Sequence, residues 1–250
     1  MDTNYNPFSL EGKTILITGA SSGIGRATAI ECSKLGAKCV ITGRNQERLQ
    51  ETFDQLEGEG HLQIIADLST QDGIDLIVEQ LPELDGIVNN AGINIMKPLS
   101  FIRIEDLEFI YHTNTYAPIL LIKYVIRKKK LKTNASLVFT ASIAAFESTL
   151  GNSIYGTSKA AVEAFMRYCA RELSGKLIRS NAVLPAMVET NLIANSAVSE
   201  EQHEIDKLRY PLKRYGKPED IAWAIIYLLS DASSWVTGHS LILDGGKTLV

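Results

Sequence analysis

Short apolar runs rich in β-branched residues alternate along this chain with longer amphipathic stretches, and this alternation limits the fold more than any other feature. The runs predict seven strands: Thr14–Thr18, Cys39–Thr42, Ile64–Ala66, Gly86–Asn89, Ser136–Ala141, Arg179–Leu184 and Ser240–Leu243. Strands separated by helical stretches form βαβ units, which make the strands parallel and cover both faces with helices. We therefore predict an α/β fold with one doubly wound, seven-stranded parallel sheet. Since no linker or repeat divides the sequence, residues 1–250 should form a single domain.

The composition favours a globular protein that binds a small molecule. Of 250 residues, 45% are hydrophobic and 22% are charged, and the net charge is -4. Without a basic excess, we expect neither nucleic acid nor an anionic membrane surface as a partner. The start of the chain is polar, and no apolar run is long enough to cross a bilayer, so we expect a cytoplasmic protein. The three cysteines and four histidines lack the spacing of metal ligands, and we predict no metal.

A glycine-rich turn follows the first predicted strand. It has the sequence Gly19-Ala20-Ser21-Ser22-Gly23-Ile24-Gly25 and runs into a helical stretch. Such a turn lets the backbone approach a pyrophosphate, whose charge then lies at the free N–H groups of the helix. A tight structural turn is the alternative, but the position directly after the first strand favours a dinucleotide site.

Arg44 directly follows the second predicted strand. An acidic residue near this position would hold the ribose hydroxyls of NAD, whereas a guanidinium suits the 2′-phosphate of NADP. No carboxylate lies between Val40 and Gln46. We therefore predict NADP(H) in preference to NAD(H), with Ser21 or Ser22 as a further contact; a simple surface arginine is the alternative.

Tyr155 and Lys159 are four residues apart in a helical pattern, and Ser142 precedes them. Residues i and i+4 share a helix face, so the lysine can influence the phenol. Ser142 could polarise a carbonyl oxygen while Tyr155 gives that oxygen a proton. We expect the charge of Lys159, together with the positive charge of an oxidised nicotinamide, to lower the pKa of Tyr155 toward neutrality. Taken alone, a tyrosine and a lysine at this spacing would more often be a surface pair.

With these motifs and Asn89-Asn90-Ala91-Gly92, the chain resembles the short-chain dehydrogenase/reductase family from Gly12 to Gly246. The resemblance implies a Rossmann fold, an oxidoreductase and a homotetramer. It also implies that Lys159 holds the nicotinamide ribose and that Asn114 is a catalytic residue that holds a water. The further cofactor contacts implied by the resemblance are Asp67, Leu68, Asn90, Ala91, Gly92, Pro185, Val188 and Thr190.

The sequence departs from the family at Pro185-Ala186, where Pro-Gly is common. If this position needs a positive φ, alanine would be strained there by about 1 kcal/mol. We expect only a small adjustment where the chain enters a substrate lid at about residues 186–212. The mixed side chains of this lid, among them Met187, Leu192 and Asn195, do not identify a substrate.

The stretch Tyr210–Ala222 is most similar to bacterial 3-oxoacyl-(acyl carrier protein) reductases. In those reductases, basic residues help to dock the acidic carrier protein, and Lys128, Lys129, Lys130 and Arg171 have similar places here. A solvated helix end is the alternative for the lysines. The resulting hypothesis is an NADPH-dependent ketone reductase that acts on a carbonyl or acyl-thioester substrate. The alternatives are an alcohol, sugar or steroid dehydrogenase working oxidatively, and a non-catalytic dinucleotide-binding regulator.

Overall fold

Seven parallel strands form one sheet in the computed structural model, which describes residues 5–190 and 199–249. The order across the sheet is β3-β2-β1-β4-β5-β6-β7. The bounds are β1 Thr14–Thr18, β2 Lys38–Gly43, β3 Leu62–Ile65, β4 Leu84–Asn89, β5 Leu131–Thr140, β6 Arg179–Pro185 and β7 Ser240–Leu243. The predicted doubly wound α/β sheet is therefore confirmed.

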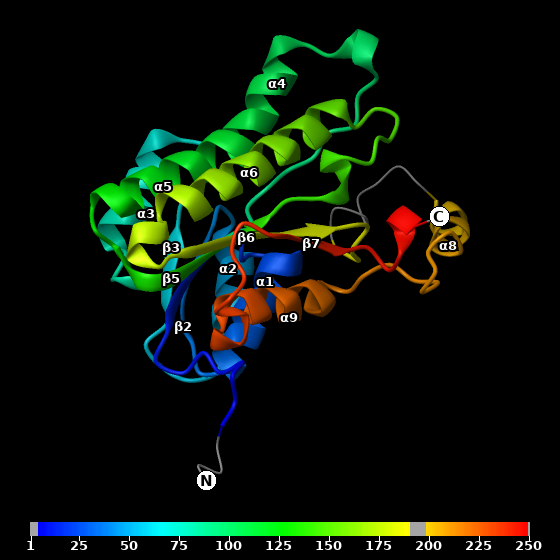
Figure 1. Cartoon of the computed structure of the whole chain (residues 1–250). Helices are drawn as coiled ribbons and strands as arrows, with labels where there is room; N and C mark the ends of the chain where they lie inside the picture. Colours follow the sequence, from blue (N-terminus) through cyan, green and yellow to red (C-terminus); the bar gives the residue numbers. More distant parts are fainter. Residues whose placement is uncertain (1–4, 191–198, 250) are drawn as a thin grey trace.

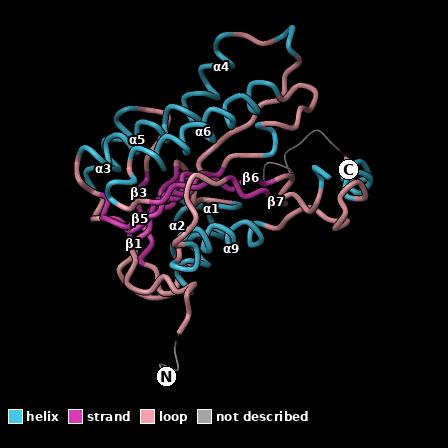
Figure 2. Tube along the Cα trace, viewed as in Figure 1, coloured by secondary structure: helices cyan, strands magenta, loops and turns pink. Residues whose placement is uncertain are grey.

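Helices cover both faces of the sheet, which is seen nearly edge-on in Figures 1 and 2. On one face lie α3 (Gln71–Gln80), α4 (Ile104–Tyr111), α5 (Ala117–Arg127) and α6 (Ser153–Glu172). On the other lie α1 (Gly23–Lys34), α2 (Gln46–Phe53) and α9 (Pro218–Leu229). A short helix, α8 (Glu200–Lys207), lies away from both layers, near the C-terminus of the chain.

The side chains of each strand point alternately to the two faces of the sheet, and this divides the core into two layers. On β1, Leu16 packs with the layer under α3, α5 and α6, whereas Ile15 and Ile17 pack with the layer under α1 and α9. Successive side chains of a strand point to opposite faces, so a strand covered on both sides is apolar throughout. This burial explains why the strands could be found as unbroken apolar runs.

The strand ends differ modestly from the predicted ranges. β1 and β7 begin and end where predicted, whereas β5 begins five residues before the expected Ser136. The extra residues include Lys132 and Asn134, which are polar and give no apolar signal. Leu131 pairs with Leu84 across a register shift between β4 and β5, which lengthens both strands toward their amino ends. No helix of the described residues is long and apolar enough to cross a membrane.

Candidate functional site

Parallel strands bring the predicted site residues to one edge of the sheet. Gly19 follows β1, Arg44 follows β2, Asn90 follows β4 and Ser142 lies just beyond β5. In open parallel sheets, ligands bind outside the carboxyl ends of the strands. Residues that are far apart in the sequence are thus gathered at the edge where the fold itself favours a ligand.

The glycine turn has no room for larger side chains. Gly19 has a φ of 67°, and a Cβ built on it would lie 2.8 Å from the Cα of Ala91. A Cβ on Gly25 would lie 2.3 Å from the carbonyl oxygen of Gly19. A Cβ on Gly23, which has a φ of 54°, would lie 3.0 Å from the methyl carbon of Thr190. The glycines are therefore required by the close approach of the turn to the chain after β4.

Thr18, the last residue of β1 and not among the predicted site residues, holds the turn close to the chain after β4. Its hydroxyl accepts hydrogen bonds from the backbone N–H groups of Asn90 (2.9 Å) and Ala91 (3.0 Å) and donates one to the carbonyl oxygen of Val88. Asn90 in turn donates from its amide to the carbonyl oxygen of Thr18. A threonine at the end of a buried strand looks like a core residue, so only its position before the glycines could have marked it.

Arg44 is half-exposed and lies beside Asp67. Its Nη1 is 3.7 Å from Oδ2 of Asp67, and its side chain is 55% exposed. Burial raises the pKa of Asp67, but hydrogen bonds from Ser69 and the charge of Arg44 outweigh this, and the net pKa is lowered. An open hollow beside Arg44 is lined by Asn45, Gln46, Glu47 and Gln50. The guanidinium is therefore accessible to an anionic group of a ligand.

Ser142, two residues after β5, lies beside Tyr155, in the first turn of α6. Burial raises the pKa of the Tyr155 phenol, and a hydrogen bond with Ser142 partly opposes this rise. The Ser142 hydroxyl also lies 3.4 Å from the carbonyl oxygen of Pro185 and accepts from the N–H of Ala144. Lys159 does not contribute to this shift, and without the positive charge of an oxidised nicotinamide the phenol is protonated at neutral pH.

Lys159 is buried, with 4% of its surface exposed. Its Nζ donates a 2.8 Å hydrogen bond to the carbonyl oxygen of Thr140 and lies 5.7 Å from the centre of the Tyr155 ring. Burial lowers the pKa of Lys159 to about 8, because a charged ammonium loses its hydration there. At neutral pH Lys159 is therefore still mostly protonated, and its hydrogen bond directs Nζ to the carbonyl oxygen of Thr140.

Asn114 lies in a π-helical turn, His112–Tyr116, between α4 and α5. Its Oδ1 accepts from the N–H of Ile93 (2.9 Å), and its Nδ2 donates to the carbonyl oxygen of Ile93 and to the hydroxyl of Ser158. A Cβ on Gly92 would lie 3.1 Å from Nζ of Lys159 and 3.4 Å from Oδ1 of Asn114. The side chain of Asn114 thus joins the chain after β4 to α6, directly beside Lys159.

Pro185 is the last residue of β6, and Val188 and Thr190 follow it, while residues 191–198 of the predicted lid lie outside the described residues. Val188 forms a parallel bridge with Gly216. The φ of Ala186 is not positive, so the strain that a positive φ would cause at an alanine is absent. Its N–H donates to the carbonyl oxygen of Leu243, which keeps the backbone extended from β6.

A tyrosine anchors the helix of the lid. The hydroxyl of Tyr215, a residue only 2% exposed, donates to Oδ2 of Asp206 at 3.0 Å and lies 3.2 Å from Nδ1 of His203. Both partners belong to α8, and Gly216 follows Tyr215 directly. The lid helix is thereby tied to the bridge between Gly216 and Val188, a link that sequence spacing did not reveal.

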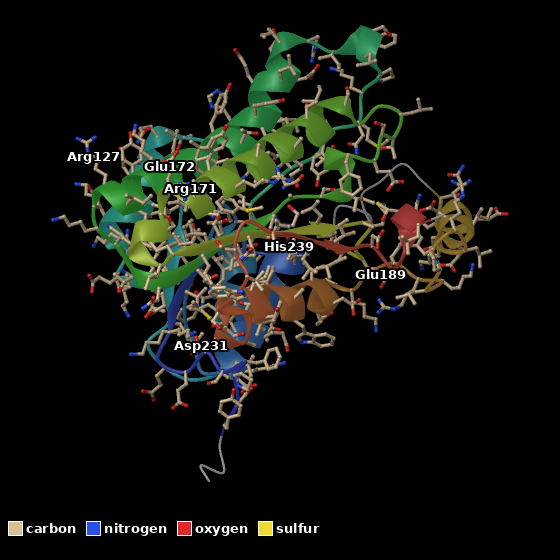
Figure 3. All side chains as sticks on the ribbon, viewed as in Figure 1. Arg127, Arg171, Glu172, Glu189, Asp231 and His239 are labelled. Carbon is tan, nitrogen blue, oxygen red and sulfur yellow. The ribbon has the colours of Figure 1, made fainter. Side chains whose placement is uncertain are left out.

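The predicted basic cluster is only partly available to a partner. Lys130 donates from Nζ to the carbonyl oxygen of Leu81 at 2.6 Å, so its charge is used within the fold. Lys128, Lys129 and Arg171 are exposed. Arg171 and the neighbouring Arg127 are labelled on the same side of the molecule in Figure 3. Lys130 must therefore be removed from the set of docking candidates.

The residues at this edge fit a dinucleotide. The turn at Gly19–Gly25 offers backbone where side chains would block a pyrophosphate. Within residues 5–190 and 199–249, the buried side-chain atoms without a hydrogen-bond partner also lie on this edge: those of Thr42, Asn89, Thr140, Glu147, Asn152 and Ser153. Buried polar groups are normally paired, and the atoms of Thr42, Asn89 and Thr140 lie at the carboxyl ends of strands, where a ligand or water would supply their partners. No group of three or more described His, Cys, Asp or Glu residues is placed to hold a metal ion.

The sheet order and the glycine turn after β1 define an α/β protein of the doubly wound, dinucleotide-binding type. A family model described as enoyl-(acyl carrier protein) reductase matches residues 19–248. A 3-oxoacyl-(acyl carrier protein) reductase of Thermotoga maritima is 34% identical over 246 residues, covering 96% of this chain and 99% of that protein. Carbonyl reductase family member 4 of Danio rerio is 32% identical, covering 94% and 98%. The chain belongs to the short-chain dehydrogenase/reductase family.

Solved structures agree with this assignment. A short-chain dehydrogenase/reductase from Mycobacterium marinum is 31% identical, with a TM-score of 0.87 and 98% of each chain covered. A candidate NAD(P)-dependent gluconate 5-dehydrogenase from Beutenbergia cavernae, with NADP bound at low occupancy, is 30% identical. Its TM-score is 0.88, and the match covers 98% of this chain and all of that one. The predicted family and fold are confirmed.

Proposed function

We propose that the protein is an NADPH-dependent oxidoreductase that reduces a ketone to a secondary alcohol. When bound, the reduced nicotinamide would supply the hydride that is added to the carbonyl carbon. Tyr155 would donate its phenolic proton to the carbonyl oxygen, and Ser142 would donate a hydrogen bond to the same oxygen. The carrying observation is that Tyr155, with its pKa raised by burial, is hydrogen-bonded to Ser142. A protonated phenol at this position is a proton donor.

Lys159 would hold the nicotinamide ribose and help to return the proton to Tyr155. Its pKa of about 8 places it near its own titration at neutral pH, where it can both give and accept a proton. Asn114 would hold the water through which Lys159 is reprotonated from solvent. The contacts of its side chain with Ile93 and Ser158 would keep that turn in place beside Lys159.

The proposed preference for NADPH rests on Arg44. Its exposed guanidinium, next to the start of α2, would pair with a 2′-phosphate. Ser21, whose hydroxyl faces Gly43 in the same corner, would add a polar contact. The adenine would lie by Asp67 and Leu68, the nicotinamide ribose by Asn90, Ala91 and Gly92, and the carboxamide by Pro185, Val188 and Thr190.

A 3-oxoacyl thioester on an acyl carrier protein is the second candidate substrate. It is favoured by the name of the Thermotoga maritima relative and by the exposed cations Lys128, Lys129 and Arg171. An acidic carrier protein would be attracted to such a group. We also propose a homotetramer, since Leu99, Phe101 and Phe109 are exposed on or before α4 and would be covered in an assembly.

A cofactor and substrate screen tests this function. The purified protein is mixed with NADPH or NADH and a panel of ketones and acetoacetyl thioesters, and the absorbance of the reduced nicotinamide is followed. We expect ketone-dependent oxidation that is faster with NADPH. Tight binding of NADPH without turnover of any ketone would instead favour the non-catalytic regulator, and turnover only of alcohols with NAD would favour the oxidative dehydrogenase.

A further inference from the structure

The chain after β7 forms a hydrogen-bonded turn that presents Lys247. The carboxylate of Asp244 accepts from the N–H of Gly246 (2.9 Å) and from the N–H and the hydroxyl of Thr248 (both 2.7 Å). The N–H of Lys247 itself donates to the carbonyl oxygen of Asp244 at 3.1 Å. The backbone on both sides of Lys247 is therefore held by one carboxylate, and the position of this lysine is fixed although it lies close to the end of the chain.

Lys247 forms an ion pair with Glu147, a residue 100 positions earlier, in the connection from β5 to α6. Nζ of Lys247 donates to Oε1 of Glu147 at 3.0 Å, and the two side chains are 23% and 27% exposed. Fully exposed ion pairs contribute little, but an ion pair that is largely shielded from water is stronger. The pair thus links the C-terminal turn to the connection that carries the site.

Glu147 closes a short turn that begins at Ser142, and we call residues 142–147 the serine turn. The N–H of Glu147 donates to the carbonyl oxygen of Ile143 at 2.7 Å. The N–H of Ala144 donates to the hydroxyl oxygen of Ser142 at 3.2 Å. The backbone of the serine turn therefore sets the position and the direction of the Ser142 hydroxyl.

The serine turn packs closely against the first turn of α6. A Cβ built on Gly156 would lie 2.5 Å from the carbonyl oxygen of Ala144, so only a glycine allows this approach. Gly156 directly follows Tyr155, whose phenol is hydrogen-bonded to Ser142. A shift of the serine turn would therefore move Ser142 relative to Tyr155, and the two hydroxyl groups would no longer reach the same carbonyl oxygen.

We propose that Lys247 is a positioning residue for the reaction: its ion pair with Glu147 holds the serine turn, and the turn holds the Ser142 hydroxyl beside Tyr155. This inference rests on the proposed ketone reduction and adds a residue to it. Lys247 acts on the chemical step, because a displaced hydrogen-bond donor slows the reaction of the bound ketone. NADPH binding should be unaffected, since neither residue of the pair belongs to the glycine turn or lies beside Arg44.

The charge of Lys247, and not only its bulk, is required. Oε2 of Glu147 is buried and has no hydrogen-bond partner in the described structure. An arginine at position 247 can donate to both carboxylate oxygens, since a guanidinium binds a carboxylate with two N–H groups. Lys247→Arg should therefore keep the serine turn in place, whereas Lys247→Met, with a side chain of similar shape and no charge, should release it.

The test measures kcat and KM for the ketone that the wild type reduces fastest, and Kd for NADPH, in a set of variants. In Lys247→Met we expect kcat to fall at least five-fold, while KM for the ketone and Kd for NADPH stay within two-fold. Lys247→Arg should keep kcat within two-fold of the wild type. Glu147→Gln, which removes only the charge of the partner, should lower kcat at least three-fold even if Lys247→Met folds poorly.

Lys13→Met is the matched control. Lys13 donates to Asp231 at 2.6 Å, and its side chain is also 23% exposed, but it precedes β1, at the opposite edge of the sheet from the site. Loss of this ion pair should leave kcat unchanged. Thermal melting of each variant checks its folding.

A double variant shows whether Lys247 acts through Ser142. In Ser142→Ala the serine turn no longer holds a hydroxyl, so adding Lys247→Met should lower the remaining kcat less than two-fold. A purely structural role of the ion pair would give the same loss with and without the Ser142 hydroxyl, and that result would contradict the inference.

The outcomes separate this inference from the proposed function. If Lys247→Met and Glu147→Gln both keep the kcat of Lys13→Met, ketone reduction stands and the inference is wrong. The inference is also wrong if Lys247→Arg is as slow as Lys247→Met, or if Kd for NADPH rises in proportion to the loss of kcat. If the wild type reduces no ketone of any kind, the proposed function itself is wrong, and the inference fails with it.

Discussion

Nζ of Lys159 donates a 2.8 Å hydrogen bond to the carbonyl oxygen of Thr140, the last residue of β5. The ammonium is held inside the protein between the end of a central strand and the Tyr155 ring, 5.7 Å from its centre. Burial lowers its pKa to about 8 from a usual value of 10.5. Lys159 is therefore a charge that the folded state accommodates at a cost.

This cost predicts a pH dependence of stability. Between about pH 8 and pH 10.5, the unfolded chain keeps the proton of Lys159 and the folded chain loses it. The free energy of unfolding should therefore rise with pH in this window, by up to about 3 kcal/mol from this residue, and the cost should be fully present below pH 8. Denaturant unfolding of the cofactor-free protein and of Lys159→Met at several pH values measures the difference. The difference in unfolding free energy between the two proteins should increasingly favour the wild type as the pH rises.

Lys176→Met serves as the control for this series, because Lys176 is exposed after α6. Its difference from the wild type should not change with pH. An unfolding free energy of Lys159→Met that follows that of the wild type at every pH would show that Lys159 titrates normally.

The glycine turn predicts a steric effect on cofactor binding. In Gly25→Ala, the new Cβ would lie 2.3 Å from the carbonyl oxygen of Gly19, so the turn must shift away from its present path. We expect NADPH affinity, measured by fluorescence titration, to fall at least ten-fold. Gly175→Ala is the matched control, since no atom lies within 4 Å of its new Cβ. Equal affinities of the two variants would contradict the assignment of this turn to the pyrophosphate.

The position of the Arg44 guanidinium predicts which of the two nicotinamide cofactors binds more tightly. Arg44→Ala removes the guanidinium beside the α2 hollow and should weaken NADPH at least ten-fold while changing NADH less than three-fold, because only NADPH carries a 2′-phosphate. Affinities for both cofactors are measured in the same titration. Arg48→Ala, four residues along the same surface, controls for a general loss of positive charge. Equal losses for both cofactors would exclude Arg44 as the source of selectivity.

The fold and the spacing of polar groups along the chain could be predicted from the sequence for a physical reason. Strands buried on both faces give apolar runs, and Tyr155 and Lys159 lie on one face of α6 because helix geometry requires it. The partners of these residues were not accessible. The bond from Lys159 to Thr140 depends on how α6 packs against β5, and the raised pKa of Tyr155 depends on the burial that this packing creates.

Two other features lay beyond sequence reasoning for similar reasons. Asn114 lies in a π-helical turn that directs its amide toward Ile93, and such a turn has no compositional signal. Tyr215 anchors α8 through single hydrogen bonds between its hydroxyl and two residues of that helix. Such contacts are decided by tertiary packing, whereas helix and strand patterns are decided by burial along each element.

In the proposed function, the Tyr155 hydroxyl protonates the carbonyl oxygen of the substrate. Tyr155→Phe removes only this hydroxyl, and Tyr168→Phe, on the exposed surface of the same helix, is the matched control. The decisive measurement is kcat/KM for the ketone that is reduced fastest, together with the Kd for NADPH. We expect Tyr155→Phe to lose at least a thousand-fold in kcat/KM, about 4 kcal/mol of transition-state stabilisation, with a Kd within three-fold of the wild type. A Tyr155→Phe enzyme that keeps the activity of Tyr168→Phe would contradict the account.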